Sequence, residues 1–308
     1  MRKFIASCLG CLLVATPAFA GREPVPPMAL TEHDRVVAGG RAVLVELPQY
    51  EIGTDVDVGR VVSDSSQYGG GFLGALILDA SDDKRERLTS MEMDKATARV
   101  APLRQAIRDF DFNALAVAST RSALSHLDWF GAQNPEWIKS PSDNDRRALI
   151  SGAGTKQLAT ISYHYLLSPD FTQIRVVADV TLWQPAAARA GGPQPALTAI
   201  YGHRITAITE LRKRSYEPAE NVALWSADGG KLARASITAA LARLEQLIPF
   251  ALGLNQADVD ALARKKADKK ADKIFAAGFY GPPVTAFPSI AGEKVIWSQG
   301  LIEVMPTP

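Results

Sequence analysis

The sequence is poor in the residue types that most often bind metals or act as activated nucleophiles. Its 308 residues include 2 cysteines and 4 histidines, and both cysteines, Cys8 and Cys11, lie near the N-terminus. No two histidines have the spacing of a zinc-binding helix, and there is no G-x-S-x-G motif and no S-x-x-K motif with its K-T-G partner. We therefore expect no metal site, no cofactor and no locally encoded hydrolase motif.

The sequence also lacks an excess of charge of either sign. Lys and Arg together number 34 and Asp and Glu 33, which gives a formal net charge of +1. A chain so balanced has no global field that would recruit nucleic acid, so we expect no nucleic-acid partner. Beyond the first twenty residues no apolar run reaches 18 residues, and we expect no transmembrane helix in the mature chain. The apolar share of 47% is typical of a globular protein.

Residues 1–20 have the order of parts expected of a secretory signal peptide. Arg2 and Lys3 precede an apolar stretch too short to span a membrane, and Ala18-Phe19-Ala20 is typical of a cleavage site. We expect export to the periplasm or the medium, with a peripheral place at a membrane left open. Cleavage would leave a mature chain without cysteine. A short buried N-terminal helix is the alternative interpretation of this segment.

The rest of the chain divides into three predicted regions. Residues 21–35 contain three prolines and are predicted to be a flexible leader, and residues 36–215 are predicted to form an α/β sheet domain. Residues 216–308 are predicted to form a helical C-terminal region with short terminal strands, which packs on the sheet domain. Asp111 and Ser142 are placed as N-caps of two helices. A stripe of apolar residues predicts a long helix after Gly230.

The alternating stretches 157–167, 172–183 and 197–211 predict three long strands in an antiparallel meander. We expect an α+β (or mixed α/β) fold, in which this meander lies within a larger sheet and is packed by several amphipathic helices. A loop at 168–171 would fix the register of the first two strands. That register pairs Tyr165 with Ile174, Tyr163 with Val176, Ile161 with Ala178, and His164 with Arg175.

Two segments are candidates for an interaction surface. The first combines glycines with apolar residues and comprises Gly70, Gly71, Phe72, Leu73 and Gly74. A dinucleotide-binding loop would need a strand directly before it, which the sequence does not offer, so core packing or a contact surface remain. The second is the basic run with Lys265, Lys266, Lys269 and Lys270, which is either a solvated helix face or a contact for anionic lipid or an acidic partner.

A weaker candidate is a polar site formed by His164, Arg175 and His203. The expected register sets Arg175 beside His164, which would keep that imidazole neutral. His203 falls on an apolar strand face, where we expect a hydrogen-bonded core histidine. From these features we expect a non-catalytic interaction or accessory protein of the cell envelope. The alternative is an envelope hydrolase whose site is assembled from residues distant in the sequence.

Overall fold

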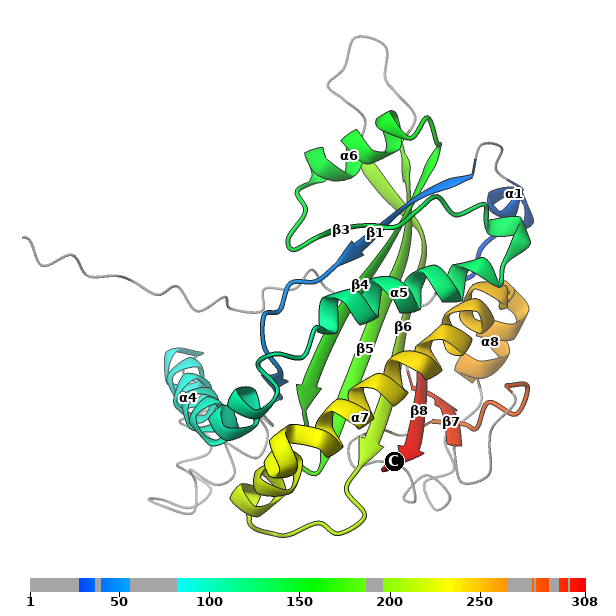
Figure 1. Ribbon diagram of the computed structural model, residues 1–308. Helices are drawn as coiled ribbons and strands as arrows, with labels where there is room; N and C mark the ends of the chain where they lie inside the picture. Colours follow the sequence, from blue (N-terminus) through cyan, green and yellow to red (C-terminus); the bar gives the residue numbers. More distant parts are fainter. Residues whose placement is uncertain are drawn as a thin grey trace, which may run out of the picture.

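A computed structural model describes residues 28–36, 40–55, 82–186, 196–264, 279, 281–287, 294–298 and 300–308. These residues form an α+β fold with a mixed sheet, as predicted (Figure 1). The strands are β1 (Arg41–Glu46), β2 (Gly53–Thr54), β3 (Glu136–Ile138), β4 (Gln157–Leu167), β5 (Gln173–Pro185), β6 (Leu197–Glu210), β7 (Lys294–Trp297) and β8 (Leu301–Pro306). The helices are α1 (Glu32–Arg35), α4 (Asp82–Ala106), α5 (Phe112–Ser125), η1 (Asp128–Phe130), α6 (Asp143–Gly152), α7 (Pro218–Gly253) and α8 (Gln256–Arg264).

The sheet is built outward from three long neighbouring strands. Its order is β3-β1-β4-β5-β6-β8-β7, and β2 pairs with β4 beside this path. β4, β5 and β6 are antiparallel neighbours in chain order. β1 joins β4 in parallel and β8 joins β6 in parallel, so segments from both parts of the chain complete one sheet.

The predicted register of β4 and β5 is wrong by two residues. Tyr165 lies opposite Val176, and His164 lies opposite Val177 rather than Arg175. The turn is shifted one residue along the chain, because the Ser168 N–H donates to the Gln173 carbonyl oxygen at 3.0 Å. A shift of two leaves every side chain on its predicted face, so the apolar face of the prediction is retained.

Helix α7 contains a break that the sequence marks with glycine. Ala227 is extended, and Asp228, Gly229 and Gly230 all have positive φ values, a conformation that glycine adopts readily. The predicted helix after Gly230 is present, and a further helical segment from Pro218 precedes the break. Among the described helices, none alone is long and apolar enough to cross a membrane; α7 and α8 together pass by length and composition but are bent by 111°.

The two predicted caps are present. The Asp111 side chain accepts a hydrogen bond from the Ala114 N–H and caps α5. Ser142 and Asp145 form a reciprocal capping box at the start of α6. These local signals fix where two helices begin, and therefore how they meet the sheet.

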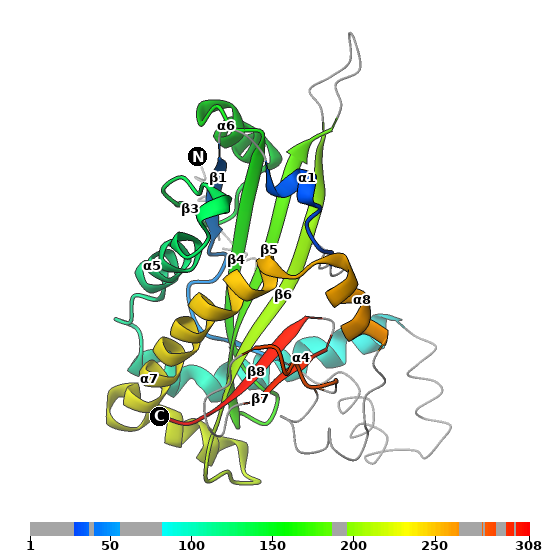
Figure 2. The same ribbon diagram turned by 90° about the vertical axis from the view of Figure 1, so that its right-hand side faces the viewer.

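Helices α5 and α7 lie across one face of the sheet, which we call the covered face (Figure 1). The main core forms there, with Ile161, Tyr163 and Val176 from the sheet and Leu244 from α7 almost completely buried. On the opposite face, α6 packs near one end of the strands through Ile150 (Figure 2). A small apolar cluster of Ile208, Ile296 and Ile302 lies on that same face toward the other end.

The first and last described segments of the chain both close on β6. The Met28 N–H donates to the Gly202 carbonyl oxygen at 3.0 Å, and β8 pairs with β6 from Ile205 onward. Ala29 and Leu30 are buried. Residues 28–35, which the sequence analysis assigns to the leader, thus form a bridge to the sheet and helix α1.

Candidate functional site

A row of polar side chains crosses the middle of the face opposite α5 and α7. Glu46 lies opposite Ser162, Ser162 opposite Asp179, and Asp179 opposite Arg204, so four neighbouring strands each contribute one residue. We call these four residues the polar row. Alternation along each strand puts them on one face, between α6 and the Ile208 cluster. This face is therefore polar where neither neighbouring cluster covers it.

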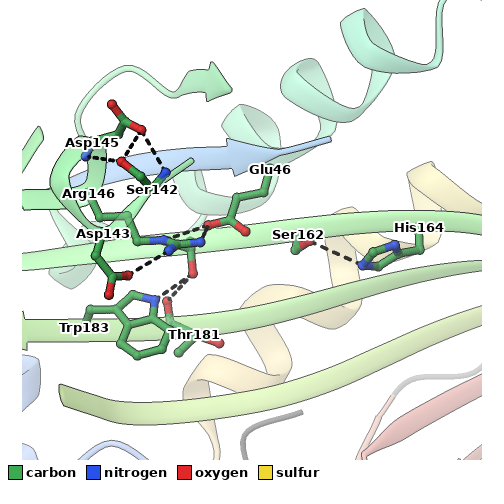
Figure 3. A network of polar contacts seen from close by, with 10 residues as sticks. Glu46, Ser142, Asp143, Asp145, Arg146, Ser162, His164, Thr181 and Trp183 are labelled. Atoms are coloured by element: carbon green, nitrogen blue, oxygen red, sulfur yellow. Dashed lines mark hydrogen bonds and ion pairs between the residues drawn. The ribbon is translucent and has the colours of Figure 1, made fainter. Parts of the chain in front are cut away.

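Both carboxylates of the polar row are held by arginine. Arg146 of α6 donates to Glu46 Oε1 from Nε at 3.1 Å and Nη2 at 2.8 Å (Figure 3). Arg204 binds the two oxygens of Asp179 at 2.7 and 2.9 Å, and its hydrogen bond to Asp179 raises the Arg204 pKa. In each pair two N–H groups of one arginine bind the carboxylate, and this holds the acidic side chain in position.

His164 lies two residues after Ser162 on the same face. Its Nε2 atom is 3.4 Å from the Ser162 Oγ atom, and Figure 3 shows the two side chains pointing toward each other. Burial lowers the pKa of His164, Asp179 opposes this shift, and Arg204 adds to it. The positive charge that favours the neutral imidazole is therefore that of Arg204, and not that of Arg175 as the predicted register implied.

Arg175 belongs to a separate group nearer the turn between β4 and β5. It donates from Nε to Gln173 Oε1 and from Nη1 to Asp55 Oδ2, both at 3.0 Å. Its guanidinium carbon is 4.8 Å from the centre of the Phe279 ring. Burial lowers the pKa of Arg175 against the attraction of Asp55. Arg175 thus ties β5 to the segment after β2, which is a structural contact.

His203 lies on the covered face and is separated from the other two candidates by the sheet. It is buried in the core, as predicted, but among the described residues neither ring nitrogen has a hydrogen-bond partner, so the expected hydrogen bond is not found there. Burial lowers its pKa to about 4. The three predicted residues therefore do not form one site.

The remaining predicted candidates lie outside the described residues. These are Gly70, Gly71, Phe72, Leu73, Gly74, Lys265, Lys266, Lys269 and Lys270. Residues 1–20, interpreted as a signal peptide, are outside them as well. Within the described part of the chain, no group of three or more His, Cys, Asp or Glu side chains is placed to hold a metal ion.

A groove of about 480 Å³ opens between α6 and the β1–β3 edge of the sheet. Its floor includes a bulge, because two residues of β1, Ala42 and Val43, lie opposite three residues, 133–135. The charged residues that line it are Glu136 and Asp145, and the Asp145 carboxylate already serves the cap of α6. Of its two described carboxylates, that of Asp145 is therefore engaged in the helix cap.

The comparisons with known proteins found no matching family model, and no significant match among curated proteins or among solved structures. The geometry of this chain therefore carries the functional argument. Sequence reasoning missed the polar row, because all three of its cross-strand pairs depend on which strands are neighbours and in which register. Only the spacing of Ser162 and His164 on one predicted strand face pointed toward it.

Proposed function

We propose that this chain is an exported, non-catalytic interaction or accessory protein of the cell envelope, and that it works through the face carrying the polar row. The observation behind the proposal is that this strip combines polar side chains with accessible surface. Arg204 and Asp179 have side-chain exposures of 45% and 24%, and Val177 beside them is half-buried. A rigid strip of this kind suits recognition by a partner protein.

The state of the charged groups favours binding over catalysis. Glu46 and Asp179 each accept bonds from an arginine, so neither is available as a general base without breaking an ion pair. Ser162 lies in a strand that is paired on both sides. Its neighbouring backbone N–H groups are therefore used in the sheet, and acyl transfer would need free N–H groups as oxyanion donors.

Site-specific photocrosslinking in cells tests the interaction. A crosslinking amino acid at position 177 should give a discrete adduct that is lost with Asp179→Ala/Arg204→Ala. The same probe at Arg121, exposed on α5, is the matched control and should give no such adduct. Equal adducts at positions 177 and 121 would contradict the proposed surface. An adduct at position 177 that the double substitution leaves unchanged would contradict it as well. Export is tested separately, by fractionation and N-terminal sequencing, and we expect Gly21 as the mature N-terminus.

The alternative function, an envelope hydrolase, is favoured by one observation. Ser162 and His164 are within 3.4 Å, with Asp179 opposite the serine. This resembles a nucleophile and its base. A fluorophosphonate probe distinguishes the two functions: labelling of the wild type that is lost in Ser162→Ala but kept in Ser125→Ala would support the hydrolase. Absence of labelling at Ser162 agrees with the binding function.

A further inference from the structure

His203 lies where the two described ends of the chain meet on β6. Met28 bridges to the preceding residue, Gly202, and β8 begins its pairing two residues later, at Ile205 with Leu301. The imidazole is 2% exposed and lies on the covered face, opposite Val180 of β5. A titratable group is therefore enclosed at the junction that closes the sheet.

Aromatic rings enclose the imidazole. The Tyr201 ring is stacked on it with centroids 5.1 Å apart, and the Trp297 ring meets it edge-on at 5.3 Å. Trp297 is the last residue of β7, the edge strand of the described sheet. Neither Nδ1 nor Nε2 of His203 has a hydrogen-bond partner among the residues that the structure describes. The neutral ring fits these surroundings, whereas a charged ring would find no acceptor in the described part of the chain.

The described charged groups around this junction would not stabilise a positive charge on His203. From α1, Arg35 acts on the neighbouring Tyr201 and carries the same sign as an imidazolium. From α7 and β8, Arg243 and Glu303 bind each other, with Arg243 Nε 3.0 Å from both carboxylate oxygens. Lys294 of β7 is exposed and also positive. Burial alone shifts the pKa of His203 downward, to about 4.

We propose that His203 is an acid-sensitive latch, which holds the β7–β8 hairpin and the N-terminal segment (residues 28–36) on β6 while its imidazole is neutral. Protonation requires the ring to reach water, because aromatic contacts offset only part of the cost of burying a charge. The hairpin and the N-terminal segment are the elements that can separate, since both lie on the outer edge of β6 whereas β5 is held on both sides.

The expected size of the effect follows from the two protonation equilibria. An exposed histidine titrates near pH 6.5 and the buried one near pH 4, so acid favours the open form. Relative to pH 7, the opening equilibrium should rise about 20-fold at pH 5 and about 100-fold at pH 4. The proposal rests on the geometry around His203 and is independent of the proposed interaction surface.

Hydrogen exchange of the purified full chain, read by mass spectrometry and corrected for intrinsic rates, tests the latch. Peptides covering residues 294–306 and 28–36 should lose protection as the pH falls from 7 to 5, and at each pH they should remain less protected than a peptide covering 157–167. His203→Phe retains an aromatic ring and should abolish the pH dependence. His164→Gln, on the opposite face, should leave it unchanged.

Three results would overturn the latch. The first is unchanged protection of residues 294–306 in the wild type at pH 4. The second is the same acid response in His203→Phe and in a second variant, His203→Gln, which keeps the polarity without the charge. The third is equal protection of residues 294–306 and 157–167 at each pH, which would show that both exchange through global unfolding instead of a local opening.

Discussion

The Arg243–Glu303 pair on the covered face is almost completely buried, whereas the Arg204–Asp179 pair on the opposite face lies beside solvent. Arg243 and Glu303 form an ion pair whose side chains are 7% and 0% exposed. Arg204 and Asp179, on the opposite face of the sheet, also form a direct pair, and their side chains are 45% and 24% exposed. The two pairs have similar chemistry in very different surroundings.

The difference separates structural from functional uses of charge. A pair held in the core must stay satisfied, because a charge without its partner there is costly. A pair near solvent contributes little to stability, and its groups can exchange partners at small cost. Charged groups that bind another molecule are therefore expected on the face opposite α5 and α7. This is a further reason to place the interaction surface on the polar row.

Glu303→Ala should produce the largest loss of stability. The substitution removes the carboxylate that binds Arg243 between α7 and β8, and breaking a buried pair in this way costs about 3–5 kcal/mol. Urea denaturation of the variant and the wild type measures the change. A loss below about 1 kcal/mol would show that the core tolerates the lone guanidinium, and the contrast between the faces would fail.

The pH dependence of stability should come mainly from the histidine of the covered face. The folded-state pKa of His203, about 4, lies below the ordinary 6.5, so the neutral native form loses stability as the pH falls from 6.5 toward 4. The loss amounts to about 3 kcal/mol at the low end. Urea denaturation at pH 7 and pH 4.5 should show a smaller difference in His203→Phe. His164→Gln should change it less, because Asp179 opposes the lowered pKa of His164.

Tyr163→Phe tests a neutral polar contact on the covered face. The Tyr163 hydroxyl is 2.9 Å from the Thr120 hydroxyl, and both groups are buried. Its removal leaves Thr120 without this partner, and we expect a loss of about 1–2 kcal/mol by urea denaturation. Thr120→Val in the same background should restore part of the loss. No recovery would mean that the hydroxyl pair is not the source.

Asp179→Ala should have the smallest effect on stability. The pair with Arg204 is partly exposed, and such pairs contribute about 0.2–1 kcal/mol. Thermal unfolding should therefore change by no more than a few degrees, while the crosslinking at position 177 is weakened. A loss comparable to that of Glu303→Ala would assign the polar row to the structural framework and weaken its proposed role in binding.

The long periodic segments were predictable because their patterns are local. Alternation in β4, β5 and β6 marks both the strands and their faces, and capping side chains such as Asp111 and Ser142 mark helix starts. The register in which β4 pairs with β5 could not be predicted from these local patterns. Asp170 accepts hydrogen bonds from Ser168 and Thr172 and moves the turn by one residue, a detail of side-chain geometry that periodicity does not contain.

The candidate site was harder to predict than the fold because it depends on strand order. Glu46 ends the first strand and meets Ser162 only because β1 inserts beside β4. For His203, the sequence predicted the burial of the side chain but not its surroundings. Its burial followed from alternation, but the missing hydrogen-bond partner depends on Tyr201 and Trp297, which close around the ring from two strands.

The closure of β6 by two segments far apart in the sequence, at Met28 and at residues 301–306, has a consequence for how the protein is made. β8 pairs with β6 along residues 301–306, so that edge stays open until these residues have left the ribosome or a translocation channel. Contacts of such long sequence separation form late, and an open strand edge invites pairing with other chains. Loss of β8 alone would therefore leave an apolar, half-paired sheet edge prone to aggregate, even though the other described strands were present.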